Sequence, residues 1–206
     1  PWHAHHIAER YSLFAIIALG EGVVGTLATL SAVVEAQGWT VDVALVCIAG
    51  MGLTFGLWWL YYLLPSATVL HSHRERCFVW GYGQLITVTS IVATGAGLHV
   101  AAYFIEHKAE IGPLATLLSV AIPISVFLAS IYALYYYLVR RFELLHAWLL
   151  VATAAVIAAA VIAAIMGVDM AICLVILTFA PVVTVVGYEV LGHRHQEQAL
   201  ADIGAR

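Results

Sequence analysis

The sequence predicts an all-α, polytopic membrane protein: one bundle of about six transmembrane helices. Of its 206 residues, 64% are hydrophobic and only 10% are charged, whereas about 25% of a soluble domain is charged. The mean hydropathy is +1.00. A water-soluble fold of this size would have too few polar side chains to cover its surface. The formal net charge is −4, and the sequence has no basic patch. Nucleic acid is therefore not an expected partner.

The apolar residues fall into long stretches separated by short polar clusters. A helix needs roughly 20 such residues to cross about 30 Å of hydrocarbon. Membrane-spanning β-strands are excluded because they are about ten residues long and alternate in polarity. The expected spans, which together form a single domain over 1–206, are 11–34, 41–64, 78–105, 114–138, 147–166 and 170–190.

Arginine is distributed unevenly between the connecting segments. It occurs before the first stretch, between the second and third, between the fourth and fifth, and after the last, whereas Lys108 falls on the other side. Cytoplasmic segments of membrane proteins are enriched in Lys and Arg. Both termini are therefore expected in the cytoplasm. The chain begins with Pro1, which suggests a fragment of a larger membrane protein.

Glu21 is an ionisable residue about three turns into the first apolar stretch. At about 100° per residue, Arg10 and Glu21 differ by only about 20° in direction, and His6 precedes Arg10 by one turn. These residues, with Phe14 and Ile17 between them, predict a polar stripe that faces the protein interior. The helical rise separates Glu21 from Arg10 by about 16 Å, so Glu21 needs another partner.

A carboxylate near the bilayer centre costs several kcal/mol unless it is paired, hydrated or protonated. Gly20, Gly22 and Gly25 leave space for a helix, a water or an ion beside Glu21. Glu21 is therefore a candidate proton or cation site. The alternative is a protonated Glu21 that hydrogen-bonds a backbone carbonyl and only locks two helices together.

Three further polar residues are candidates for the same chemistry. His99 lies toward the outer end of the third stretch, where it either contributes to a site or hydrogen-bonds a carbonyl. A haem would need a second histidine on a facing span, and the sequence shows none. The sequence therefore identifies no cofactor. Glu189, in the last stretch, is expected to pair with Arg10 or Arg194. Glu9 points about 100° away from Arg10 and should contact other groups.

Histidines also gather on the expected cytoplasmic side, where they could bind Zn²⁺ or another divalent ion together with Glu9. Their spacing matches no closed structural site, so a solvated, weakly chelating surface is the favoured interpretation. The weak metal-ligand candidates are His3, His5, His6, His193 and His195.

The stretch HHIAERYSLFAIIALGEGVVGTL resembles the H-x-x-E-R-F-x-L-F-x-I-I-x-L-G-E-x-V signature of the bacterial low temperature requirement protein A family. His6, Glu9, Arg10 and Glu21 match it position by position. LWWLYY, WGYGQL and GAGLHVA resemble later elements of that family. The resemblance implies a multi-pass protein of the bacterial inner membrane linked to growth at low temperature, and this chain would be the C-terminal half. Gln84 stands where the family is expected to carry a histidine, which puts any function of that histidine in doubt here.

The preferred function is transport of protons or a small cation, with Glu21 as the site and with Arg10 and His6 gating access from the cytoplasm. A metal-dependent membrane enzyme using the cytoplasmic His and Glu residues is one rival. A non-catalytic membrane scaffold is the other, and enzymatic activity is not the favoured interpretation. Membrane lipids are the expected surroundings, and the alanine-rich fifth stretch suggests close helix packing or a homo-oligomer.

Overall fold

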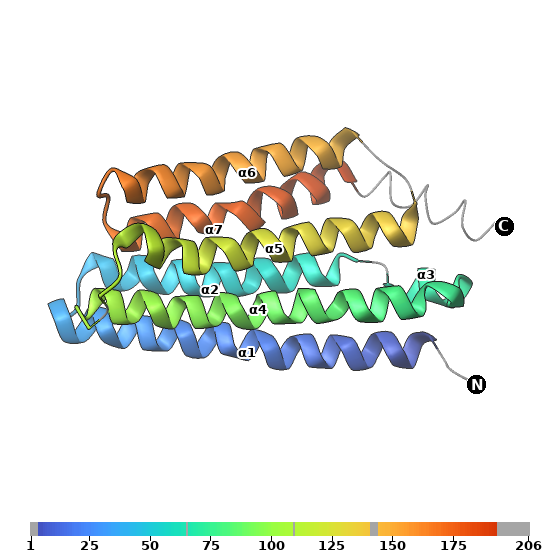
Figure 1. Ribbon diagram of the computed structural model, residues 1–206, viewed down its shortest axis with the longest axis horizontal. Coiled ribbons are helices and arrows are strands. Elements are labelled where there is room, and N and C mark those ends of the chain that lie inside the picture. Colours follow the sequence, from blue (N-terminus) through green and yellow to red (C-terminus); the bar gives the residue numbers. More distant parts are fainter. Residues whose placement is uncertain (1–3, 65, 109, 141–143, 193–206) are drawn as a thin grey trace.

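The protein is a bundle of long helices whose axes are nearly parallel (Figure 1). The computed structural model describes residues 4–64, 66–108, 110–140 and 144–192. Every regular element in these ranges is helical. Six helices of this part of the chain are long and apolar enough to cross a membrane. The expectation of an all-α bundle with six transmembrane helices is confirmed.

The six long helices are joined by short connections and by one small helix. The second connection contains α3 (Ser66–Ser72) and a single 3₁₀ turn, η1 (Arg74–Arg76), which the sequence interpretation had treated as a polar loop. A π-helical turn, η2 (Tyr188–Gly192), continues the last helix. The long helices are α1 (Ala4–Gln37), α2 (Val41–Tyr62), α4 (Cys77–Ile105), α5 (Pro113–Val139), α6 (Leu144–Ile165) and α7 (Met170–Gly187).

Local sequence signals explain several helix ends. After α1, Gly38 has a φ of +75°, and its N–H donates to the Val34 carbonyl at 2.8 Å. Pro113 occupies the first turn of α5, where its missing N–H is tolerated. Asp169 caps α7 by accepting a hydrogen bond from the Ala171 N–H at 2.8 Å.

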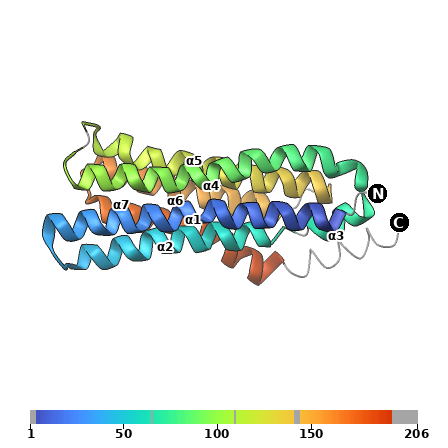
Figure 2. The ribbon, with the colours of Figure 1, turned by 90° about the horizontal axis from the view of Figure 1, so that it is seen from below.

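The helices pack in the order α1, α2, α7, α6, α5, α4, and α4 closes the ring against α1. The largest group of buried apolar side chains draws on all six long helices and includes Leu53, Ile91, Phe127 and Leu177. A second group lies around α3 and the start of α4. Figure 2 shows these helices at the end of the bundle where α1 begins. Because α2 lies between α1 and α7, residues of α1 and α7 do not face each other directly.

Candidate intramembrane site

Small residues bring α1 against its neighbours at seven-residue intervals. Ala8, Ala15, Gly22 and Thr29 form one such series, and all four are buried. A second series consists of Ala18, Gly25 and Ala32, which are also buried. Small side chains at helix contacts let two backbones approach closely within a membrane. This seam faces α2 and α4.

The closest approach of α1 to α4 is at Gly95. A Cβ atom on Gly95 would lie 2.7 Å from both the backbone carbonyl carbon and the Cγ of Glu21. Gly25 meets the backbone of Gly95 from the other side of the same contact. Glycine is therefore required sterically at residue 95, and it places the main chain of α4 directly beside Glu21.

A threonine fixes the register of the two helices next to this contact. The Thr29 hydroxyl lies 2.7 Å from the Leu98 carbonyl of α4 and 2.8 Å from the Gly25 carbonyl of its own helix. Thr29 is fully buried. The register that follows brings the residue after Leu98, which is His99, alongside Glu21.

Glu21 and His99 form the polar contact at this place. The Glu21 Oε1 and His99 Nε2 atoms are 3.5 Å apart, and the two side chains are 41% and 31% exposed, respectively. Glu21 is 17 residues from the first residue of α1 (21 − 4) and 16 from the last (37 − 21), so it lies at the middle of the helix. The structure thus brings together two sequence-predicted site residues that lie 78 positions apart (99 − 21). Such a pair can hold, share or release a proton.

The predicted inward-facing stripe on α1 is wrong. Arg10 is exposed, and Phe14 and Ile17 are 50% and 72% exposed. Helical periodicity shows which residues share a face, but it does not show which face turns inward. The small residues of the seam permit the closest packing, so they face the bundle, and the larger side chains of the stripe face outward with Glu21 at their edge.

The predicted Arg10–Glu189 pair is also not formed. The Trp59 Nε1–H of α2 donates a hydrogen bond to Glu189 Oε1 at 3.1 Å. Arg10 makes no ion pair within 4 Å among the residues that the structure describes. The physical reason is the position of α2, which separates α1 from α7 and offers its own donor to Glu189.

The other predicted residues lie at the end of the bundle where α1 begins. His6 Nδ1 is 3.2 Å from Glu9 Oε2, and both side chains are more than half exposed. Within the described ranges, no group of three His, Cys, Asp or Glu side chains could hold a metal ion. His3, His193 and His195 lie outside the described residues, and the side chain of His5 is likewise not described.

At the opposite end of the bundle, the short connection after α4 carries Lys108, the basic residue expected on the side without arginines. Lys108 Nζ is 3.0 Å from Glu106 Oε2, and this hydrogen bond raises the pKa of the Lys108 ammonium. The pair directly follows the last residue of α4, Ile105, at the end of the bundle opposite Cys77.

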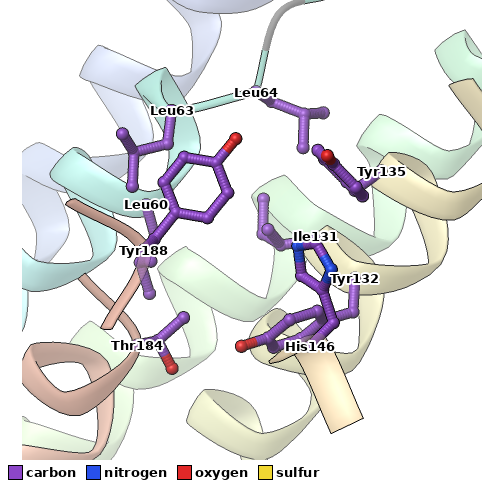
Figure 3. Close-up of a pocket in the computed structure, with 9 residues that line it drawn as sticks. All are labelled: Leu60, Leu63, Leu64, Ile131, Tyr132, Tyr135, His146, Thr184 and Tyr188. Atoms are coloured by element: carbon purple, nitrogen blue, oxygen red, sulfur yellow. The ribbon is translucent and has the colours of Figure 1, made fainter. Parts of the chain in front are cut away.

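A second intramembrane histidine, which the sequence interpretation did not select, lies in an aromatic cluster at the start of α6. His146 is only 8% exposed, and its ring centroid lies 4.6 Å from that of Tyr135, 5.8 Å from that of Tyr132 and 6.2 Å from that of Tyr188. These side chains line a mainly apolar cavity between α2, α5, α6 and α7 (Figure 3). About 30 Å³ of it is accessible to the centre of a water molecule, which is room for one or two waters.

The expected span at 147–166 began one residue after this histidine. The structure starts α6 at Leu144, and His146 shares a buried face with Thr153 and Ala160 at seven-residue intervals. This seven-residue spacing is the sequence pattern that could have predicted the burial of His146. The Thr153 and Thr184 hydroxyl oxygens, 2.9 Å apart, join α6 to α7 beneath the cavity.

Gln84, the residue at the position where a histidine was expected, faces the interior. It is 1% exposed, and its Oε1 atom accepts no hydrogen bond from any residue that the structure describes. It lies one turn after Trp80 on the buried face of α4, whereas His99 lies on the flank that meets Glu21. Gln84 is therefore not part of the Glu21–His99 contact.

Six apolar helices that enclose an apolar core and bury few charges define a multi-pass membrane protein. The sequence profile of a family described as bacterial low temperature requirement A protein (LtrA) matches residues 1–181. The chain belongs to this family. No curated protein and no solved structure gives a significant match.

Proposed function

We propose that the protein carries protons or a small cation across the membrane, and that Glu21 and His99 form the site at which the charge is held. The observation that supports this most is the contact between Glu21 Oε1 and His99 Nε2 at the middle of α1. Ionisable side chains inside membrane spans are rare, and they commonly mark ion pathways or proton relays.

The chemistry of the pair suits reversible proton binding. With one proton shared, the pair exists either as a neutral acid beside a neutral imidazole or as a carboxylate beside an imidazolium, and both states are net neutral. Adding a proton makes the pair cationic and removing one makes it anionic, so the pair can be loaded and unloaded. Both side chains are only partly buried, which leaves room beside the pair for a water, an ion or a neighbouring helix.

Packing around the pair supports the same proposal. Gly95 and Gly25 hold α1 and α4 at backbone contact, and Thr29 fixes their register. A site that must hold two titratable groups at a constant separation benefits from such rigid support. Arg10 and His6 contribute nothing to this support, because their side chains are exposed at the end of the bundle.

The test is flux in proteoliposomes that contain the purified protein and an internal pH-sensitive dye. Glu21→Gln keeps the shape of the side chain but removes its ionisation, so we expect it to fold normally and to lose at least about tenfold in proton or cation flux, a difference of about 1.4 kcal/mol in the barrier. Glu35→Gln makes the same change at an exposed position of the same helix and should keep full flux.

Two outcomes would contradict the proposal. Unchanged flux in Glu21→Gln would make Glu21 a structural latch. No flux of any ion tested with the wild-type protein would favour a non-catalytic scaffold.

The proposal includes an orientation, with both ends of the chain in the cytoplasm and the bundle in the bacterial inner membrane. It rests on the arginines that flank the spans and on the positive-inside rule. In a variant that lacks Cys47 and Cys173, an impermeant thiol reagent should label Cys77 only after the inner face is opened. Labelling of Cys77 in intact cells would reverse the orientation.

A further inference from the structure

A cavity of about 350 Å³ lies between α1, α2, α3 and α4 at the end of the bundle where α1 begins. Figure 2 shows α3 beside the starts of α1 and α4 at this end. The cavity is separate from the Glu21–His99 contact, which lies about three turns further along α1. Its polar and aromatic lining side chains are Glu9, Ser12, Tyr61, Tyr62, Ser66 and Trp80.

The charge of the lining has one sign. Glu9 carries the only carboxylate among the lining residues that the structure describes, and none of these residues is Lys, Arg or His. The Glu9 side chain is 55% exposed and lies 3.2 Å from the His6 ring, so it stands at the rim. Serine and tyrosine hydroxyls can donate or accept hydrogen bonds on the remaining wall. This lining favours a cation with N–H donors over an anion.

Aromatic side chains form much of the wall, and their positions are fixed. The Tyr62 hydroxyl donates to the Ser12 carbonyl at 3.0 Å, which joins α2 to α1 across the cavity. Trp80 is 1% exposed and packs edge-on against Tyr11 with ring centroids 5.1 Å apart, so it supports the wall from behind. Organic cations bind well where a carboxylate and the rings of tyrosine or tryptophan surround one space.

The last turn of α2 places the cavity at the level of the lipid headgroups. Trp58, Trp59 and Tyr62 are all at least 40% exposed. The ring centroid of Trp58 lies 6.3 Å from that of Trp59 and 5.6 Å from that of Tyr62. Exposed tryptophan and tyrosine at a span end are typical of the membrane–water interface. A ligand of this cavity can therefore come from the headgroup layer or from water.

We propose that this cavity binds an ammonium group, with Glu9 as its counter-ion and the partly exposed Tyr62 ring as its aromatic face, backed by the buried rings of Tyr61 and Trp80. A phospholipid with an ammonium headgroup and a soluble amine carry the same recognised chemistry. The proposal does not depend on transport, because none of the residues involved belongs to the Glu21–His99 site.

Native mass spectrometry of the full chain, purified from nanodiscs with equal amounts of phosphatidylethanolamine and phosphatidylglycerol, tests the lipid source. The ammonium lipid should be retained in preference, and Glu9→Gln should reduce its retention about tenfold or more, because a charge-assisted hydrogen bond is lost. Glu35→Gln removes the same charge near the other end of α1 and should change nothing. His6→Gln removes the neighbouring ring and should leave retention at least as high as in the wild type.

A soluble amine is tested with methylammonium, which carries N–H donors and should raise the thermal unfolding temperature of the detergent-solubilised wild-type protein but not of Glu9→Gln. Tyr62→Phe keeps the ring and should keep binding in whichever arm is positive, whereas Tyr62→Leu should weaken it about fivefold. Binding in either arm with loss in Glu9→Gln supports the proposal and identifies the source. No binding in both arms, or equal binding by wild type and Glu9→Gln, overturns it.

Discussion

The two intramembrane histidines have different surroundings. His99 lies on the flank of the bundle, is partly exposed and faces the Glu21 carboxylate across a glycine-lined helix contact. His146 is buried among tyrosine rings from α5 and from the turn after α7. The chemical partner and the exposure of a histidine side chain, more than the residue type, therefore decide its role. A histidine beside a carboxylate can exchange a proton, whereas the His146 ring packs against tyrosine rings and so joins α6 to its neighbours.

The largest expected effect on stability is at His146. His146→Ala would remove a buried ring and enlarge the cavity of Figure 3, so the free energy of unfolding should fall by about 3 kcal/mol. His146→Phe keeps the ring volume and should lose much less. Thermal or denaturant unfolding in detergent measures both variants. If His146→Ala also abolished flux at full stability, the assignment of His146 to a packing role would be wrong.

A smaller loss is expected at the glycine contact between α1 and α4. Gly95→Ala would bring a methyl group to within 2.7 Å of the Glu21 backbone, so we expect a loss of about 2 kcal/mol. Gly20→Ala is the matched control, because nothing lies within 4 Å of its added Cβ, and it should be neutral or stabilising by up to about 1 kcal/mol. Equal unfolding temperatures for the two variants would contradict the close contact.

The smallest effect is expected at Thr29. Thr29→Val keeps the volume but removes the hydroxyl that reaches the Leu98 carbonyl, so the protein should lose about 1 kcal/mol of stability. Thr89→Val, the same change at an exposed position of α4, should shift stability by less than about 0.5 kcal/mol. A Thr29→Val protein as stable as Thr89→Val would show that this hydroxyl does not fix the register.

The sequence alone was sufficient for the architecture and for selecting Glu21 and His99 as candidates, but not for their contact. Apolar stretches of about 20 residues leave little choice of structure in a membrane, and a lone Glu21 between glycines is a visible anomaly. That His99 contacts Glu21 could not be predicted in the same way. The Glu21–His99 contact depends on the register between α1 and α4, and that register is fixed by Gly25, Gly95 and Thr29 across more than 60 intervening residues.

The orientation of α1 shows the same limit. Both the polar stripe through Arg10 and the small-residue seam through Ala15 and Gly22 follow from helical periodicity. Choosing between them requires knowing that close backbone packing with α4 and α2 stabilises the helix more than burial of a polar stripe with no partner opposite. That choice depends on residues of α2 and α4, which the sequence of α1 does not contain.

A double-mutant cycle on proton or cation flux tests the central claim most directly. If Glu21 and His99 act as one site, Glu21→Gln and His99→Gln should each lose most of the flux, and the double variant should lose little more than either single variant. All three should insert and fold like the wild type. Losses that multiply in the double variant, or full flux in either single variant, would show that the two residues do not work together and would contradict the account.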